Sequence, residues 1–290
     1  MDVFSVYKTK KPAVFLRLVG MNIGTFQIIL EKFRNEINVY KSEHWSRTKG
    51  KKCCLSVENQ LLLCILYLRD YATFINLGLL FGISESYTQK RYVFAKKMLL
   101  RCLDLPDEAS LKEAIETNLI AIDVTEQAIE RPVENQEEYY SGKKNHTAAA
   151  AAIKVLIFAC LLTGLIKAIR FSKGTTHDFK MYKDKGFALN EHIKILADLG
   201  FLGIHNEHYN ALIPHKKTKL KPLTEHQKLE NKQQASKRVA IEHLNRDCKI
   251  FRICGSKYRG KHKNYEETWQ LIAAIVNLKK STKNMKYATF

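Results

Sequence analysis

The spacing of hydrophobic residues predicts an all-helical first third of the chain. In residues 21–38 apolar side chains recur at helical spacing, with Thr25 placed to cap the helix. Residues 40–52 are polar and basic, which is typical of a connector. A second helix is predicted over residues 56–69, with Ser56 as its cap.

The residues that follow fit a helix-turn-helix arrangement. Residues 72–81 predict a short helix, residues 82–84 a Gly-Ile-Ser turn, and residues 85–100 a longer basic helix. In this motif the last helix enters the major groove, where its polar and cationic side chains meet bases and phosphates. The candidate DNA contacts on it are Gln89, Lys90 and Arg91. An ordinary three-helix bundle with a solvated basic face is the alternative.

After residue 105 the pattern changes to short apolar runs separated by polar segments. Strands are predicted over residues 118–124, 153–162, 165–171 and 192–197, and helices over residues 239–247 and 268–278. Interleaved strands and helices indicate an α/β domain, which the last helix could cover. The predicted organisation is an N-terminal helical extension (1–52), a helix-turn-helix domain (53–105) and an α/β domain (115–280).

Residues 148–166 are almost wholly apolar and close to the length of a membrane span. Lys154 interrupts this run, and Thr163-Gly164 divides it at a turn. Two buried strands are therefore favoured over a membrane helix. The first residues of the chain lack the apolar core and the cleavage site of a signal peptide. No membrane partner is expected.

The charge balance adds a partner to this picture. The chain carries 48 Lys and Arg against 29 Asp and Glu, a formal net charge of +19. Such an excess suits a polyanion, because each cation that neutralises a phosphate releases counterions. A ribosomal-type or membrane-surface protein is the alternative. None of the seven cysteines forms a Cys-x-x-Cys pair, so reduced thiols are expected rather than disulfides or a zinc site.

Three carboxylates occupy positions that suit metal-dependent phosphoryl transfer. Asp123 ends the first predicted strand, Asp198 directly follows the last one, and Glu242 lies on a predicted helix. Side chains at the carboxyl ends of strands converge on the crevice where α/β sheets bind ligands. Three such oxygen donors can hold two Mg²⁺ or Mn²⁺ ions. Each carboxylate alone also has an ordinary explanation as a cap or a solvated side chain.

The sequence motifs around these residues resemble those of a known family. The phrases AIDVTEQAIERP, QEEYYSGKKNHT, KGTTHDFKMYK and ILADLGFLGI are similar to the catalytic domain of bacterial insertion-sequence DDE transposases. The branch that they resemble is related to the Harbinger superfamily and carries its own helix-turn-helix. The resemblance covers approximately residues 50–280.

This resemblance implies an RNase H-like fold with a mixed sheet, two Mg²⁺ or Mn²⁺ ions, and cut-and-paste movement of DNA through terminal inverted repeats. It matches Asp123, Asp198 and Glu242 to the catalytic triad, with Asp178 in THDF able to replace or assist Asp198. Arg238 shares a helix face with Glu242, so it either holds a DNA phosphate or pairs with the glutamate. Further candidate DNA contacts are Lys143, Lys144, His146, His177, Lys216 and Lys217.

Double-stranded DNA is the expected partner, bound by a homo-oligomer in the bacterial cytoplasm at the nucleoid. The alanine run of residues 148–152 departs from the family pattern, and alanine is a poor strand former. A decayed or regulatory DNA-binding protein is therefore an alternative to the active transposase. A metal-dependent nuclease without strand transfer is another.

Overall fold

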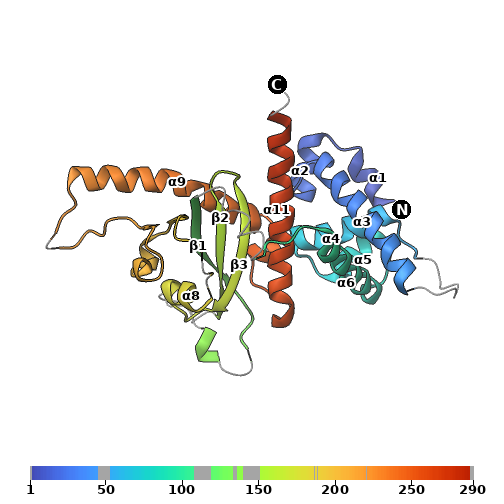
Figure 1. Ribbon diagram of the computed structural model, residues 1–290. Coiled ribbons are helices and arrows are strands. Elements are labelled where there is room, and N and C mark those ends of the chain that lie inside the picture. The colour runs from blue at the N-terminus through green and yellow to red at the C-terminus, as the bar shows by residue number, and fades with distance from the viewer. Residues whose placement is uncertain are drawn as a thin grey trace. The chain divides into compact units, whose positions relative to one another are not determined.

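The computed structural model groups the chain into two compact units (Figure 1). The first unit comprises Met1–Leu105, Lys249–Gly255 and Glu267–Phe290, and the second comprises Pro106–Cys248 and Ser256–Glu266. The apolar C-terminal helix, which was expected to cover the sheet, thus groups for most of its length with the helical unit. The structure describes residues 2–44, 53–107, 119–132, 136–139, 151–185, 187, 189–219 and 221–287.

The first unit is built from helices. They are α1 (Val3–Lys8), α2 (Pro12–Val19), α3 (Ile23–His44), α4 (Val57–Asp70), α5 (Phe74–Phe81), α6 (Glu85–Cys102), α10 (Arg252–Gly255) and most of α11 (Tyr265–Tyr287). Helix α4 is central, since its side chains from Leu61 to Leu66 are buried on every side. A helix that is apolar all round is stable only when other helices enclose it.

Two details of the first unit differ from the sequence prediction. Asn22 caps α3, because its Oδ1 accepts a hydrogen bond from the Thr25 amide at 2.7 Å; Thr25 itself lies inside the helix. The helix also continues to His44, into the stretch expected to be a connector. Tyr40 and His44 lie one turn apart in this last part of the helix, and their rings stack with centroids 4.1 Å apart. The predicted cap Ser56 is confirmed, with its hydroxyl accepting from the Asn59 amide.

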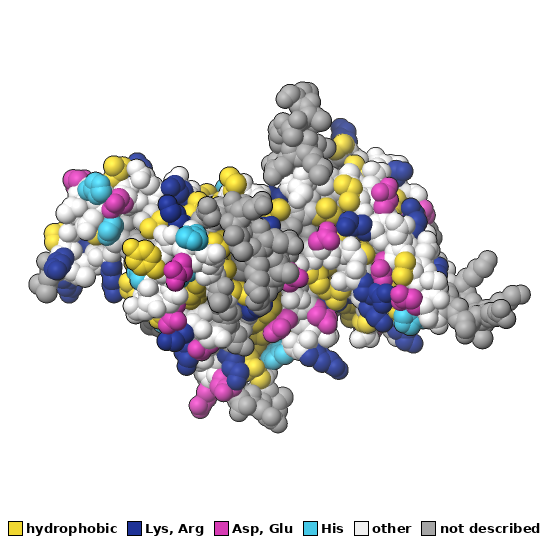
Figure 2. All heavy atoms as spheres, viewed as in Figure 1, with side chains coloured by type: hydrophobic (Ala, Val, Ile, Leu, Met, Phe, Trp, Pro, Cys, Tyr) yellow, Lys and Arg dark blue, Asp and Glu magenta, His cyan; other side chains and the backbone are white. Residues whose placement is uncertain are grey.

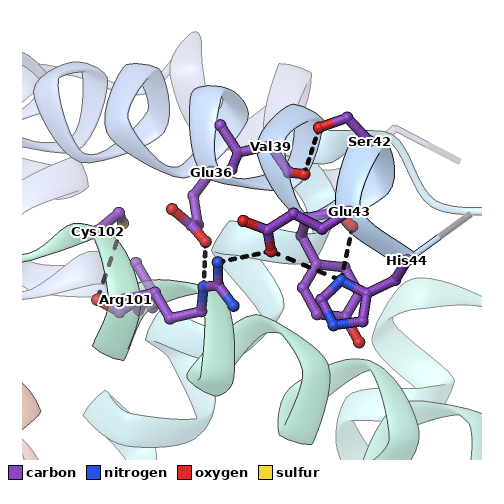
Figure 3. Close-up of polar contacts among 9 residues, drawn as sticks. Glu36, Val39, Ser42, Glu43, His44, Arg101 and Cys102 are labelled. Carbon is purple, nitrogen blue, oxygen red and sulfur yellow. Dashed lines mark hydrogen bonds and ion pairs between the residues drawn. The ribbon is translucent and has the colours of Figure 1, made fainter.

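An arginine connects the end of α6 to α3 (Figure 3). The Arg101 guanidinium donates to Glu36, and its Nη2 lies 3.0 Å from Glu43 Oε2. Both carboxylates project from α3, which ends at His44: Glu43 is the residue directly before the end, and Glu36 lies about two turns before it. The same helix that carries the candidate DNA contacts is thereby held at its C-terminal end.

The second unit contains a five-stranded mixed sheet. Its strands are β1 (Leu119–Ala128), β2 (Ala152–Cys160), β3 (Leu165–Lys173), β4 (Lys194–Leu196) and β5 (Ala211–Leu212), in the order β3-β2-β1-β4-β5. β2 is antiparallel to β1 and β3, whereas β4 is parallel to β1 and β5. This order and these directions are those of an RNase H-like sheet, as expected.

Helical segments accompany the sheet. They are η2 (Gln136–Tyr139), α8 (Asp178–Lys185), η3 (Leu199–Phe201), η4 (Ile204–Asn206), α9 (Glu225–Lys249) and η5 (His262–Asn264). Met181 and Tyr182 of α8 pack in one core cluster with Ile122 and Phe158, so α8 covers that face of the sheet. Helix α9 lies at the opposite face, where Asp123 accepts a hydrogen bond from Asn245.

The register of the strands assigns the functional side chains to faces. Asp123 is paired with Ile157, and Ile157 with Ile169, so these three side chains share the α9 face. Glu126 is paired with Lys154, and Lys154 with Ser172. Each of these residues lies an odd number of positions along its strand from the first three, so their side chains share the opposite, α8 face. Carboxylates from β1 therefore project on both sides of the sheet.

The apolar run of residues 148–166 forms sheet strands, not a membrane helix, over its described part. It becomes β2 and the start of β3, joined by a turn in which Gly164 has φ +67°. Within the described residues no single helix is long and apolar enough to cross a membrane, and only the bent pair Pro12–Val19 and Ile23–His44 passes by length and composition.

One strand is longer than predicted. β1 continues past Asp123 to Ala128, so that Asp123 lies in the middle of the strand and does not end it. The extension Thr-Glu-Gln-Ala has a polar appearance, but every one of its residues pairs with a residue of β2. Backbone pairing with a fully buried neighbour has overridden the local sequence signal.

The close approach of α5 to the turn before α6 yields a stability prediction. A Cβ added to Gly78 would lie 2.6 Å from the Ile83 carbonyl oxygen and 3.1 Å from Thr88 Oγ1. Gly78→Ala should lower the free energy of unfolding by about 1–3 kcal/mol, as overpacked sites do. Denaturant titration of the full chain measures it.

The matched control for this variant is Gly24→Ala. Gly24 is also helical, but an added Cβ would meet only Asn22 Oδ1, at an ordinary 3.4 Å. Because alanine favours helix over glycine, this variant should be neutral or stabilising. Equal effects of the two substitutions would contradict the close packing of α5 on the turn.

Candidate active site

Asp123 is the buried centre of the site. Its side chain is only 17% exposed, and two residues of α9 contact it. Asn245 Nδ2 donates to Asp123 Oδ2, and Arg238 Nη2 lies 3.4 Å from Asp123 Oδ1. Arg238 therefore faces Asp123, whereas the sequence had left open a DNA phosphate or Glu242 as its partner.

The other two carboxylates approach Asp123 from different elements. Asp198 directly follows β4 and Ala197, and its Oδ1 accepts from the Gly200 amide at 2.8 Å. Glu242 lies on α9, one turn from both Arg238 and Asn245, and is exposed. A strand end and a helix face thus bring the predicted triad toward one side of the sheet.

The pKa of Asp123 is raised to about 6. Burial is the main cause, because it penalises the charged form. Arg238 opposes the rise, while the negative charges of Asp198 and Glu242 add to it. The three predicted triad members therefore interact electrostatically. A cation placed among them would offset the cost of burying the Asp123 charge and the repulsion between the carboxylates.

Asp178 belongs to a different group of charges. Its Oδ1 lies 2.7 Å from Lys154 Nζ, and both side chains are buried. Lys154 also donates to the Thr176 carbonyl oxygen at 2.6 Å and lies 3.7 Å from Glu126 Oε1. A protein cation thus already neutralises Asp178 on the α8 face, where Asp123 does not point.

Gly200 separates Asp178 from Asp198. A Cβ at this position would lie 2.9 Å from Asp178 Oδ2 and 2.9 Å from Asp198 Oδ1. The two aspartates are therefore neighbours across one glycine. Of these two aspartates, Asp198 is the one whose charge raises the pKa of Asp123.

The predicted DNA contacts differ in accessibility. Gln89 and Lys90 are exposed on α6, whereas Arg91 is half-buried, 3.7 Å from Cys53 Sγ and 5.2 Å from the centre of the Tyr87 ring. His177, Lys216 and Lys217 are exposed. Lys143, Lys144 and His146 lie outside the described residues. Figure 2 shows Lys and Arg side chains on the visible surface of both units, interspersed with acidic ones.

The carboxylates do not form a closed metal cage. Among the residues that the structure describes, no group of three His, Cys, Asp or Glu side chains is placed to hold a metal ion. Arg238 lies against Asp123 instead. The donor set itself consists of three carboxylates, and burial together with the charges of Asp198 and Glu242 raises the pKa of Asp123. Such oxygen donors fit a hard divalent cation.

Comparison with known proteins identifies the family. Residues 122–277 match the model of the DDE superfamily endonucleases, and residues 53–95 match the helix-turn-helix of DDE superfamily endonucleases. The chain therefore belongs to the DDE superfamily endonucleases, a family that generally depends on divalent metal ions. The resemblance stated from the sequence is confirmed.

A curated relative makes the assignment more specific. The chain is 33% identical over 267 residues to a probable transposase for insertion sequence element IS702 of Microchaete diplosiphon, covering 91% of this chain and 93% of the relative. It is thus a homologue of insertion-sequence DDE transposases. A solved piggyBac transposase synaptic complex with hairpin DNA is 12% identical with a TM-score of 0.46, covering 99% of this chain and 75% of that chain.

Two residues at the site were not assigned a role from the sequence. Lys154 was noted only as a break in an apolar run, although a lysine in a buried strand requires an anionic partner. Asn245 lies three residues after Glu242, a spacing that places both on one helix face. Helical spacing could have found Asn245, whereas the Asp178 partner of Lys154 is 24 residues away along the chain.

The Lys154–Asp178 pair yields a second prediction. Lys154→Met removes the cation, keeps most of the side-chain volume and leaves Asp178 buried without its ion pair. The free energy of unfolding should fall by about 3–5 kcal/mol, the usual cost of breaking a buried pair from one side. Lys173→Met is the control, because its pair with Glu138 is half exposed and should contribute little. Similar losses in both variants would contradict the role given to Lys154.

The raised pKa of Asp123 yields a third prediction. In the metal-free protein a carboxyl whose pKa is higher folded than unfolded stabilises below its unfolded value, 3.8, and that contribution is lost as pH rises through about 6. Asp123→Asn should therefore raise the free energy of unfolding at pH 8 by up to about 3 kcal/mol. Denaturant titrations in EDTA between pH 4 and 8 measure this.

The control is Asp184→Asn, at an exposed position in α8. This substitution should leave the pH dependence between 4 and 6 as in the wild type. An Asp123→Asn protein that was no more stable than the wild type at pH 8 would show that Asp123 is not held unfavourably charged in the fold.

Proposed function

We propose that this protein is a DNA transposase that binds terminal inverted repeats of its element and carries out metal-dependent strand cleavage and transfer. Asp123, Asp198 and Glu242 would hold two Mg²⁺ or Mn²⁺ ions. The observation that carries this assignment is the burial of Asp123 on the same face as α9, where both other carboxylates act on its pKa. Bound ions of this kind activate an attacking oxygen and stabilise the leaving one.

The protein's own residues have distinct parts in this proposal. Asn245 orients the Asp123 carboxylate by donating to one of its oxygens, which leaves the other directed toward Arg238. Arg238 is a positioning residue that neutralises Asp123 and can move to a DNA phosphate when a metal takes its place. Asp178 is not a ligand in this scheme, because Lys154 holds it on the other face.

The DNA partner is inferred from charge and from the helix-turn-helix region. Gln89 and Lys90 are exposed on α6, the helix that enters the major groove in this motif. Lys216 and Lys217 would neutralise backbone phosphates near the sheet. Joining two element ends requires at least two copies, so a homo-oligomer on DNA at the bacterial nucleoid is part of the proposal.

The first test is cleavage of a labelled duplex that carries the element's own terminal repeat, with Mg²⁺, with Mn²⁺ and with EDTA. Metal-dependent cutting at the repeat boundary followed by joining to a second duplex supports the transposase. Cutting without joining would favour a metal-dependent nuclease. Tight binding without cutting under any metal would favour the decayed or regulatory protein.

Substitutions of single carboxylates test which residues are metal ligands. Asp123→Asn and Asp198→Asn should each lower the cutting rate by at least about 100-fold, because a metal-held displacement depends on each carboxylate. Repeat affinity should stay near the wild-type value or rise, since a negative charge near phosphate is removed. Asp184→Asn is the exposed control and should cut normally. Full cutting by either triad variant would overturn the assignment of that residue.

A further inference from the structure

A cavity lies in the sheet unit, and none of the three triad residues lines it. It is a cavity of about 340 Å³, at the small end of the range for ligand pockets. Its walls come from η2, the ends of β2 and β3, η5 and the first residues of α11. The lining residues are Tyr139, Ile153, Phe171, Ser172, Lys173, Thr176, His262, Tyr265 and Glu266.

Aromatic rings dominate the walls. The rings of Tyr139 and His262 lie with centroids 5.8 Å apart, and those of Phe171 and Tyr265 are also 5.8 Å apart, at 80° to one another. These four rings come from separate elements and meet around one space. Aromatic faces that line a small cavity suit a flat, π-bearing ligand, and every nucleobase offers such a face.

The helix that carries Tyr139, η2, is held against the end of β3 by several contacts. The Glu138 carbonyl oxygen accepts from Thr175 Oγ1 at 2.7 Å, and a Cβ on Gly174 would lie 2.6 Å from the Tyr139 carbonyl oxygen. Glu138 also pairs with Lys173, whose Nζ lies 5.8 Å from the centre of the Tyr139 ring. The η2 helix is thus fixed against the end of β3.

Polar groups complete the cavity. Ser172 Oγ and Thr176 Oγ1 form a hydrogen bond of 2.7 Å, so the two hydroxyls retain further donor and acceptor capacity. Lys173 supplies a cation and Glu266 a carboxylate. Donors and acceptors beside stacking faces are what recognition of a base edge requires.

The segment that carries His262 and leads into Tyr265 is strongly basic. Lys257, Arg259, Lys261 and Lys263 are exposed within seven residues. Tyr258 of the same segment anchors it to the sheet, because its amide donates to the Ala128 carbonyl oxygen at 2.8 Å. Cations beside an aromatic cavity favour a ligand whose ring is attached to phosphates.

Part of the cavity wall, formed by Ile153 and Phe171, lies on the face of the sheet that carries Asp123. Ile153 lines the cavity and lies four residues along β2 from Ile157, the residue paired with Asp123. At about 3.3 Å per residue the separation along the strand is about 13 Å. That distance corresponds to about four nucleotide steps of 3.4 Å along a DNA strand.

We propose that this cavity binds one unpaired nucleobase of the DNA strand that is held at the carboxylates. The base would leave the duplex within about four nucleotides of the cleaved phosphate and stack on the aromatic wall at Tyr139. The basic segment of residues 257–263 would contact the adjoining phosphates. This inference rests on the proposed DNA substrate. It adds a base-binding site that is separate from the proposed metal ligands.

The test compares matched and mismatched terminal-repeat duplexes. A single mismatch is placed at each of the four positions on either side of the cleavage boundary, and affinity is measured with Ca²⁺ replacing Mg²⁺. A mismatched base leaves the stack at lower cost, so one position should bind the wild type at least about five times more tightly than the matched duplex. Tyr139→Ala should lose this gain.

Two variants serve as controls. Tyr139→Phe keeps a stacking ring and should retain the gain. Tyr209→Ala removes a tyrosine of the same unit that is 86% exposed and does not line the cavity, and it should also retain the gain. These controls separate loss of stacking from general loss of an aromatic side chain.

The outcomes distinguish the cavity from the proposed function. If the repeat is bound and cut but no mismatch strengthens binding, or if Tyr139→Ala keeps the gain, the base-binding cavity is wrong and the transposase assignment stands. If the wild type shows no preference for the repeat over an unrelated duplex, the proposed substrate is wrong, and the cavity proposal fails with it.

Discussion

The burial of Asp123 in the middle of a strand sets the requirements for the rest of the sheet unit. A carboxylate that is only 17% exposed loses most of its water and needs protein partners. Both partners, Arg238 and Asn245, come from α9, so this long helix has to be fixed against the sheet. Ile241 and Leu244 of this helix are buried, while its first half is largely exposed and polar.

The two faces of the sheet neutralise their carboxylates differently. On the α8 face a buried lysine, Lys154, holds Asp178 through a 2.7 Å ion pair. On the α9 face Asp123 has an arginine at a longer distance and two further carboxylates that raise its pKa. The first arrangement is complete without a metal, whereas the second would gain from one. Gly200 lies between the two groups of acids, and a Cβ at this position would force the Asp178 and Asp198 oxygens, each 2.9 Å away, to shift.

What the sequence could predict depended on how local each signal was. The helices around Ser56 and the strands on either side of Gly164 follow from periodicity and turn residues, and the structure contains them. The full length of β1 does not follow, because Thr125 to Ala128 are strand residues only through pairing with β2. The triad candidates came from strand ends, a helix and a family resemblance. The partner of Lys154 and the four rings of the cavity could not be predicted, because they join segments that are distant in the chain.

The alanine run of residues 148–152 packs closely where the structure describes it. Ala151 and Ala152, its described members, are 1% and 4% exposed, and the Ala151 carbonyl oxygen accepts from the Ile129 amide at 2.9 Å. The Ala152 carbonyl oxygen lies where a Cβ on Gly174 would approach within 2.9 Å. Small side chains therefore suit this close meeting of β2, the end of β3 and η2, despite the poor strand propensity of alanine. Alanine at these two positions is explained by packing, so it does not by itself indicate a decayed enzyme.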